Sequence, residues 1–182
     1  AAQDFQKGRR LTGMTHAQIT FRSEVRQEDP ERVREIVVST GFFRPDEVKV
    51  AVELAESALK KGAGDGYNFL FAERNGAVAG YTCYGEIPCT IGSYDLYWIA
   101  VRDEFRRSGI GRQLLAHTES AIAGRGGRAV YIETASCEKY RPTRDFYSRN
   151  GYETAAVLKD YYSPGDDKII YVKTLAPCAG RA

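Results

Sequence analysis

A turn rich in arginine and glycine carries the clearest chemical signal in the sequence. The segment Arg106-Arg107-Ser108-Gly109-Ile110-Gly111 follows a strand-like run and leads directly into a helix-like one. Backbone N–H groups at the start of a helix have no acceptor within it, and the helix dipole adds partial positive charge there. Gly109 and Gly111 lack the Cβ atoms that would keep an anion away from these amides. The segment is therefore suited to bind a pyrophosphate.

Two common nucleotide-binding motifs do not fit this turn. The dinucleotide-binding fingerprint requires a third Gly or Ala after Gly109-Ile110-Gly111, where this chain has Leu114. The Walker A loop requires Lys followed by Ser or Thr, but Gly111 is followed by Arg112 and Gln113. Arg102 and Arg112 add further positive charge on either side. Taken alone, the turn is also compatible with a glycine-rich helix start whose arginines are solvated. The elements on either side of the turn are therefore needed to distinguish this from a pyrophosphate site.

The elements around the turn follow from hydrophobic periodicity and turn residues. The predicted strands cover residues 18–25, 67–74, 77–86, 93–101, 129–134, 152–158 and 168–174. One predicted helix starts at Asp29-Pro30, with Asp29 as its N-cap, and the others cover 45–60, 109–123 and 142–150. Asn75-Gly76 predicts a tight hairpin between the second and third strands. The predicted order is β-α-α-β-β-β-α-β-α-β-β, a mixed α/β domain.

This order of elements resembles the GNAT superfamily of acetyl-CoA-dependent N-acetyltransferases. The family's Arg/Gln-x-x-Gly-x-Gly/Ala signature appears here as Arg106 to Gly111, and a short helix carries Phe146-Tyr147 before Asn150-Gly151. The match covers residues 18–175 in element order, and its specific part covers 95–152. The resemblance implies an α/β (α+β) fold with a mixed, mostly antiparallel twisted sheet of six to seven strands, flanked by about four helices.

The resemblance also implies how acetyl-CoA, the expected co-substrate, is bound; no metal is expected. In the family, the amides of the turn hold the pyrophosphate, and the preceding strand, here Tyr97–Val101, pairs through its backbone with the pantetheine arm. That strand is splayed from the next one, here residues 129–134, which leaves a notch for the acetyl thioester. The residues expected at the coenzyme are Ile99, Ala100, Val101, Arg106, Arg107, Ser108, Gly109, Ile110, Gly111, Arg112 and Tyr147.

Tyr147 is the expected general acid. The matching family position is a tyrosine near the coenzyme sulfur, and a phenol with a pKa of about 10 stays protonated at neutral pH and can donate to a thiolate. Several family members carry a carboxylate base at the offset of Asp95, fourteen residues before Gly109, although Glu is usual there. Asp95 would then act through a bridging water. Glu86, at the end of the preceding strand, is the competing candidate.

Other residues are given structural roles. Strand alternation predicts Asp95, Tyr97 and Ile99 on one face of their strand, with Leu96 and Trp98 on the other. His117 lies in the middle of a helix and is interpreted as a surface residue, whereas His16 lies near the N-terminus and is given no role.

The expected reaction is direct transfer of the acetyl group to a primary amine in a ternary complex, without an acyl-enzyme. The acceptor is expected to be a cationic small molecule or peptide, because carboxylates attract an ammonium and aromatic faces tolerate its charge. The expected wall consists of Phe42, Phe43, Arg44, Tyr161 and Tyr162, together with Glu86 and Asp95 and an acidic loop over 160–167. An inward Arg44 would bind a substrate carboxylate and favour an amino acid or peptide.

Composition excludes several other classes. The chain has 182 residues, 26 Lys+Arg against 24 Asp+Glu, and 43% hydrophobic residues, which suit one folded domain rather than a disordered chain. Balanced charge disfavours a nucleic-acid partner, and no apolar run approaches the ~20 residues of a membrane span. A single N-acetyltransferase domain over 14–176 is predicted, and the resemblance is compatible with a homodimer.

The four cysteines, Cys83, Cys89, Cys137 and Cys178, have no CxxC spacing, and with two histidines they cannot form an ordinary zinc set. We expect a reducing cytoplasm. Met14 is interpreted as the natural start, so residues 1–13 would be a flexible or added arm, and 177–182 a tail.

Two other classes of protein remain as alternatives. A catalytically silent acetyl-CoA-binding or sensing module would keep the turn without chemistry, but Asp95 and Tyr147 disfavour it. A nucleic-acid-binding domain would use the arginine cluster, and the balanced charge argues against it.

Overall fold

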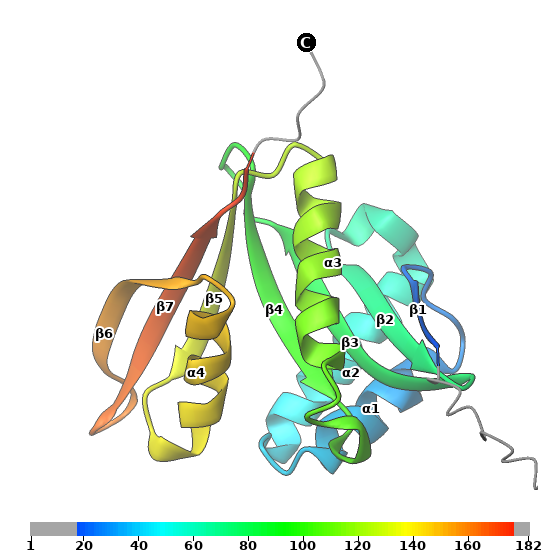
Figure 1. Ribbon diagram of the computed structural model, residues 1–182, viewed down its shortest axis with the longest axis horizontal. Coiled ribbons are helices and arrows are strands. Elements are labelled where there is room, and N and C mark those ends of the chain that lie inside the picture. The colour runs from blue at the N-terminus through cyan, green and yellow to red at the C-terminus, as the bar shows by residue number, and fades with distance from the viewer. Residues whose placement is uncertain (1–17, 177–182) are drawn as a thin grey trace, which may run out of the picture.

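The computed structural model describes residues 18–176 of the chain, in which helices cover both faces of one sheet (Figure 1). The elements are β1 (Ile19–Arg22), α1 (Asp29–Ser39), α2 (Pro45–Lys61), β2 (Asn68–Arg74), β3 (Ala77–Glu86), β4 (Ser93–Val101), α3 (Ile110–Gly124), β5 (Ala129–Ala135), α4 (Arg141–Arg149), β6 (Glu153–Ser163) and β7 (Asp166–Thr174). The predicted order is confirmed. Met14, His16 and Cys178, with the arm over 1–13 and the tail over 177–182, lie outside the described residues.

The sheet is mixed and mostly antiparallel, as expected. Its seven strands run in the order β1-β2-β3-β4-β5-β7-β6, and only β4 and β5 pair in parallel. The predicted hairpin between β2 and β3 turns at Asn75 and Gly76, whose φ angles of 53° and 78° are both positive. A type I′ turn requires this conformation at both central residues, which explains the Asn-Gly pair.

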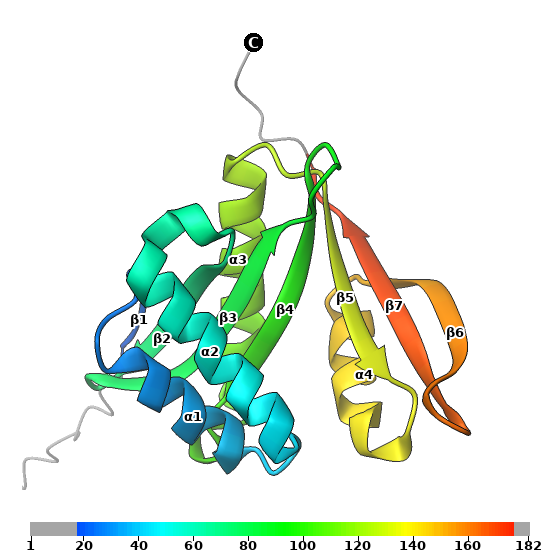
Figure 2. The same ribbon diagram turned by 180° about the vertical axis from the view of Figure 1, so that it is seen from behind.

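The sheet opens at the junction of β4 and β5. These strands pair only at Ser93–Ala129, Tyr94–Val130 and Asp95–Tyr131. Beyond Asp95, β4 continues beside β3 while β5 continues beside β7, and the ribbon shows the two halves diverging (Figures 1 and 2). The splay implied by the family resemblance is therefore present, and it leaves one edge of β4 without a strand partner.

Three clusters of apolar side chains hold the helices to the sheet. Helices α1 and α2 pack on one face of β2–β4, with Val33, Ile36 and Val37 of α1 completely buried. Helices α3 and α4 lie on the opposite face (Figure 1), and a second cluster joins α3 to β5 and β7 through Leu115, Ile122 and Val130. Burial of each such side chain stabilises the fold by roughly 1.5–3 kcal/mol. Within the described chain no helix covers the other face of β5, β7 and β6 (Figure 2).

The predicted role of Asp29 as an N-cap was wrong. Asp29 is the first residue of α1, after the N-cap Glu28, and its carboxylate is fully buried. It accepts hydrogen bonds from both terminal nitrogens of Arg22, at 2.6 and 2.7 Å, and from the amide of Arg26 at 2.6 Å. A bidentate guanidinium–carboxylate pair is stronger than a neutral capping bond. The side chain therefore joins β1 to α1.

The prediction that Leu96 and Trp98 share a face of β4 was also wrong. Cys83 of β3 lies opposite Trp98, and the next residue, Tyr84, lies opposite Leu96, so Tyr97 is an extra residue in β4. Such a β-bulge reverses the alternation beyond it. Leu96 consequently packs in the cluster beneath α3, while Trp98 packs with α1 and α2.

The acidic segment 160–167 is a hairpin rather than a loop. Strand β6 continues to Ser163, and β7 begins at Asp166 after a turn that contains Gly165 at a φ of 83°. The Asp160 carboxylate accepts the amide of Gly165 at 2.7 Å, and the Asp167 carboxylate accepts the amide of Asp160 at 3.0 Å. These carboxylates stabilise the turn itself, in the way that aspartates commonly do.

Cys83, Cys89 and Cys137 are free thiols in the described chain, and burial raises the pKa of Cys83 well above its usual value. Between residues 18 and 176, no helix combines the length and the apolar character that a bilayer crossing requires.

Candidate active site

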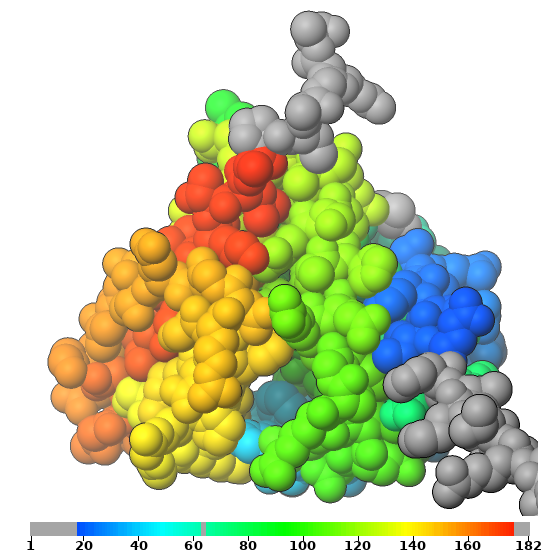
Figure 3. All heavy atoms as spheres, in the orientation of Figure 1, coloured from blue at the N-terminus to red at the C-terminus, as the bar shows by residue number. Residues whose placement is uncertain are grey.

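A cavity of about 500 Å³ lies at the open end of the sheet, between the two diverging halves. The space-filling view shows the opening between the segment before α3 and the segment carrying α4 (Figure 3). The lining residues come from the α1–α2 loop, β4, β5, α4 and the tip of the β6–β7 hairpin; they include Phe42, Phe43, Arg44, Glu47, Tyr97, Trp98, Ile99, Ala100, Val101, Arg106, Glu133, Thr134, Lys139, Tyr140, Tyr147 and Tyr162.

The start of α3 has the features expected of a phosphate site. Gly109 is the N-cap at a φ of 84°, and Arg107 also has a positive φ, of 60°. The first backbone bond of α3 runs from the amide of Gln113 to the carbonyl of Gly109, at 3.1 Å. The amides before Gln113 therefore have no helical acceptor, and they can donate to an anion.

The two glycines of the turn have different roles. Gly109 has a left-handed backbone conformation, which disfavours any residue that carries a side chain. A Cβ on Gly111 would lie 3.6 Å from Val101 of β4 and 3.8 Å from Phe146 of α4. Gly111 thus keeps open the space between the two halves of the molecule, and a branched side chain there would fill it.

The arginines around the turn do not all face the same point. Arg106 lines the cavity, where its guanidinium lies 5.4 Å from the ring of Phe42. Arg107 and Arg112 are exposed. Arg102 instead turns toward α1 and forms an ion pair with Glu35 at 2.6 Å, so it does not contribute the charge that we expected at the turn.

The remaining coenzyme candidates lie on β4, in the turn and in the first residue of α3. Ile99, Ala100 and Val101 line the cavity from β4. The hydroxyl of Ser108 donates to the carbonyl of Phe105 at 2.6 Å, and the side chain of Ile110 is buried in the core. Only the amide of Ile110 is therefore available to a ligand.

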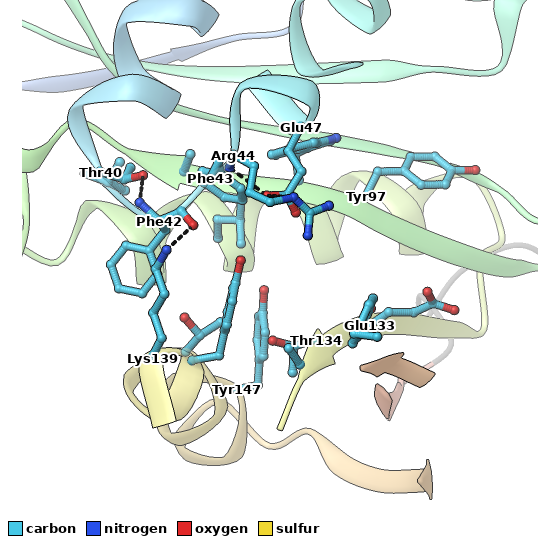
Figure 4. A pocket seen from close by; sticks show the side chains of 18 of the residues that line it. Thr40, Phe42, Phe43, Arg44, Glu47, Tyr97, Glu133, Thr134, Lys139 and Tyr147 are labelled. Carbon is cyan, nitrogen blue, oxygen red and sulfur yellow. Dashed lines mark hydrogen bonds and ion pairs between the residues drawn. The ribbon is translucent and has the colours of Figure 1, made fainter. Parts of the chain in front are cut away.

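Tyr147 projects from α4 into the cavity (Figure 4). It is only 5% exposed, and its ring packs against Phe146, Tyr152 and Tyr171 at centroid distances of 5.5 to 5.9 Å. Burial raises the pKa of Tyr147, so the phenol is protonated throughout the physiological range. The side chain is held in one place and keeps a proton available.

The two carboxylates expected as bases lie on different faces of the sheet, and neither lines the cavity. Glu86 is exposed and lies opposite Tyr94, whose ring packs beneath α3. Asp95 lies on the other face and is partly buried. Burial raises the pKa of Asp95, and so does the negative charge of Glu133, while Lys168 acts in the opposite direction.

Glu133 is a site residue that the sequence analysis missed. It lies on β5 and lines the cavity (Figure 4), and its carboxylate lies 2.6 Å from the ammonium of Lys168. The signal available in the sequence was its position at the end of a predicted strand, next to the expected notch. Strand alternation would have placed Glu133 on the face opposite Ile132.

Thr134, also missed, has a buried hydroxyl with no hydrogen-bond partner. The residue is 6% exposed and lines the cavity from β5. A buried hydroxyl without a partner costs free energy. A ligand that accepts or donates a hydrogen bond in the cavity would remove that cost, so the site fits a polar arm such as the amide-containing pantetheine.

The expected acceptor wall is only partly assembled. Phe42, Phe43, Arg44 and Tyr162 line the cavity, but Tyr161 does not, because its ring contacts the ammonium of Lys168 at 4.0 Å. The guanidinium of Arg44 is already bound to Asp46, at 3.1 and 3.2 Å. Other residues that line the same cavity are Glu47, Tyr97, Trp98, Lys139 and Tyr140.

Comparisons with known proteins agree with this geometry. Residues 65–154 match the model of the acetyltransferase (GNAT) domain. A crystal structure from Desulfovibrio desulfuricans, assigned to the GNAT family of acetyltransferases, is 48% identical, with a TM-score of 0.86 over 87% of this chain and 100% of that chain. An N-alpha-acetyltransferase of Sulfurisphaera tokodaii is 28% identical over 117 residues, 59% of this chain and 69% of the relative.

A more distant structure shares the fold. An aminoglycoside 6′-N-acetyltransferase complexed with coenzyme A is 18% identical, with a TM-score of 0.67 over 89% of this chain and 99% of that one. The splayed sheet, the open helix start and these relatives together define the class: the chain belongs to the GNAT family. It is a GNAT-type acetyltransferase, and acetyl-CoA is the acetyl donor of that family.

Proposed function

We propose that this protein transfers the acetyl group of acetyl-CoA to a primary amine, by direct attack of the amine on the thioester while both substrates are bound. The observation that carries the proposal is one cavity whose wall includes the guanidinium of Arg106, from the turn that leads into α3, together with Tyr147 and Glu133. The chemistry needs a site for an anionic coenzyme, a proton donor and a proton acceptor, and this cavity offers all three.

The coenzyme would be held by both halves of the molecule. The amides before Gln113 and the guanidinium of Arg106 suit the pyrophosphate. The edge of β4 beyond Asp95 has no strand partner, so its backbone groups can pair with the amides of the pantetheine arm. The unpaired hydroxyl of Thr134 faces the same space. When bound, acetyl-CoA supplies an activated acetyl group.

The residues of this chain would manage two protons. A bound ammonium must lose a proton before its nitrogen can form the new C–N bond, and the carboxylate of Glu133 is the group on the cavity wall suited to take it. As the C–S bond breaks, the thiolate needs a proton, which the phenol of Tyr147 can donate. After the C–N bond forms, the nitrogen loses its second proton as the C–S bond breaks, and that proton restores the phenol of Tyr147 through solvent. Glu133 releases the first proton to solvent, so the products are the amide, the free thiol of coenzyme A and one proton.

Asp95 is the alternative base. It does not line the cavity, so it would have to act through water, as its shorter side chain already suggested. The half-exposed carboxylate of Glu133 needs no such relay. We therefore assign the proton transfer to Glu133 and expect Asp95 to contribute mainly negative charge near the acceptor.

The cavity favours an acceptor whose amine is not next to a free carboxylate. Phe43, Tyr97 and Trp98 provide aromatic surface, and Glu47 and Glu133 provide negative charge. Arg44, the expected partner of a substrate carboxylate, is already paired with Asp46. A peptide N-terminus or an amino sugar meets these conditions better than a free amino acid, and the names of two relatives, an N-alpha-acetyltransferase and an aminoglycoside acetyltransferase, support this class.

An acceptor screen tests the proposal. Release of free thiol from acetyl-CoA is measured with unblocked peptides, aminoglycosides, polyamines and amino acids, for the wild type and for Glu133→Gln, Asp95→Asn and Tyr147→Phe. We expect turnover with peptides or amino sugars, a large loss in Glu133→Gln and Tyr147→Phe, and a smaller loss in Asp95→Asn. Tight coenzyme binding with no turnover of any amine would instead identify a silent acetyl-CoA-binding module.

A further inference from the structure

Lys168 is a buried lysine behind the cavity wall. It lies on β7, opposite Ala135 of β5, and is 9% exposed, which is rare for lysine unless the ammonium is paired. Its ammonium lies 2.6 Å from the Oε2 atom of Glu133 and 4.0 Å from the centroid of the Tyr161 ring. The two contacts come from different strands, β5 and β6, so they fix the ammonium on two sides.

The charged and titratable groups around this contact come from three strands besides β7. Glu133 lies on β5, Asp95 on the neighbouring strand β4, and Tyr161 and Tyr162 on β6. Asp95 and Glu133 repel each other, as the raised pKa of Asp95 indicates, after the larger effect of its burial. Lys168 is the cation that acts on both carboxylates, so its removal would leave two negative charges close together.

We propose that Lys168 is a positioning residue for acetyl transfer, which fixes the carboxylate of Glu133 at the cavity wall and supplies the counter-charge for Glu133 and Asp95. This inference rests on the proposed role of Glu133 as the proton acceptor. Lys168 acts through Glu133, and its own ammonium takes no part in the reaction.

The ammonium of Lys168 is suited to be a permanent charge. Burial alone would lower the pKa of Lys168, but the hydrogen bonds to Glu133 and Tyr161 outweigh that effect and raise it. The side chain therefore stays charged while acceptor amines lose their protons. Methionine has a similar length and would fill the same space, and the carboxylate of Glu133 that loses its partner is half exposed to solvent, so we expect the variant to fold. The charge, rather than the packing, is what the site would lose.

The first test follows Glu133 directly and needs no substrate. The full chain is labelled with ¹³C at the glutamate carboxyls, and the signal of Glu133, assigned by its loss in Glu133→Gln, is observed by NMR at neutral pH. In Lys168→Met this signal should change position and broaden, because the carboxylate loses the ammonium that holds it at 2.6 Å. Lys168→Arg keeps the charge and should leave the signal close to its wild-type position. An unchanged Glu133 signal in Lys168→Met overturns the inference.

The second test measures kcat and both KM values at neutral pH, with acetyl-CoA and an unblocked peptide. In Lys168→Met, kcat should fall roughly tenfold while the KM for acetyl-CoA and the coenzyme-dependent thermal stabilisation are retained, and Lys168→Arg should restore most of the loss. Lys173→Met is the matched control, since Lys173 lies on the same strand but pairs with Glu119, at 2.7 Å, away from the cavity. Its kinetic constants should match those of the wild type.

A double variant separates this inference from the proposed function. In the Glu133→Gln background, Lys168→Met should have no further effect on kcat. A persisting effect would mean that Lys168 does not act through Glu133, which overturns the inference. If Glu133→Gln alone retains full turnover, the proposed role of Glu133 fails, and the positioning role fails with it even though the NMR signal of Glu133 changes in Lys168→Met.

Discussion

The ammonium of Lys139 donates a hydrogen bond to the carbonyl oxygen of Phe42, at 2.6 Å. Phe42 belongs to the α1–α2 loop, while Lys139 lies just before α4, so this contact bridges the two halves of the molecule where β4 and β5 no longer pair (Figure 4). The ring of Phe42 also lies edge-on to Tyr140, at 5.9 Å. The α1–α2 loop is thereby fastened across the cavity.

Lys139→Met should loosen this bridge with little effect on the fold. Lys139 is exposed, so we expect a loss of at most about 1 kcal/mol, or a fall in Tm of under about 4 °C. The KM for the amine should rise severalfold, while the acetyl-CoA dependence changes less. Steady-state kinetics with each substrate varied provide the measurement. Lys159→Met, on the exposed edge strand, is the control, and equal effects of both variants would contradict the bridge.

Gly111→Val should abolish coenzyme binding without unfolding the protein. The new side chain would fill the space between Val101 and Phe146, whereas Gly111→Ala would make only ordinary contacts. A ligand at a hundred times its Kd stabilises a protein by about 2.7 kcal/mol, so acetyl-CoA should raise the Tm of the wild type clearly. Thermal unfolding with and without acetyl-CoA should show no shift for Gly111→Val. Gly124→Val, at the open far end of α3, should keep the shift.

Thr134→Val should stabilise the free protein and weaken the coenzyme complex. The change removes a buried hydroxyl without a partner and keeps the shape of the side chain, so the free energy of unfolding should rise by about 1 kcal/mol or more. The acetyl-CoA-induced rise in Tm should become smaller. Thr82→Val is the matched control: the hydroxyl of Thr82 is paired with that of Thr118, at 2.8 Å, and its loss should destabilise the protein. Destabilisation by Thr134→Val would show that its hydroxyl is already satisfied.

Asp95→Asn should change stability in a pH-dependent way. Burial and then the charge of Glu133 raise the pKa of Asp95 in the folded protein, so the ionised carboxylate opposes folding. Below the pKa of about 3.9 that the carboxyl has in the unfolded chain, Asp95 is protonated in both states and does not destabilise the fold. The destabilisation grows from that pH up to the raised pKa of the folded protein and is complete above it. Denaturant unfolding from pH 4 to 8 should therefore show Asp95→Asn gaining stability over the wild type as pH rises. The exposed Asp145→Asn is the control and should not gain stability in this way. A gain in the free energy of unfolding that is the same at every pH, or equally large in Asp145→Asn, would show that it does not come from the ionised carboxylate of Asp95.

The parts of the molecule that depend on neighbouring residues could be predicted from the sequence. The start of α3, the β2–β3 hairpin and the short helix with Tyr147 each follow from local backbone and capping rules, and the structure has all three. The order of the elements was also readable, because the periodicity changes clearly between strands and helices. The place of Tyr147 in the cavity needed the family resemblance as well.

The parts that depend on strand register could not be predicted. Glu133 meets Lys168 only because β5 and β7 pair antiparallel with Ala135 opposite Lys168, and these residues are far apart in the chain. The bulge at Tyr97 inserts one residue and exchanges the faces of everything beyond it, a change that periodicity cannot foresee. The buried pair of Arg22 and Asp29 likewise forms only after β1 packs against α1.

The three residue pairs between β4 and β5 have a consequence for folding cooperativity. The chain from β1 to α3 and the chain from β5 to β7 each complete their own hydrogen-bonded ladders, and they are joined by the core cluster beneath α3 and by side-chain contacts such as Lys173–Glu119 and Lys139–Phe42. Such an arrangement favours two units that open separately, and amide hydrogen exchange would then give each unit its own opening free energy. A coenzyme bound between them must be released before either half can open, so its binding would merge the two units into one.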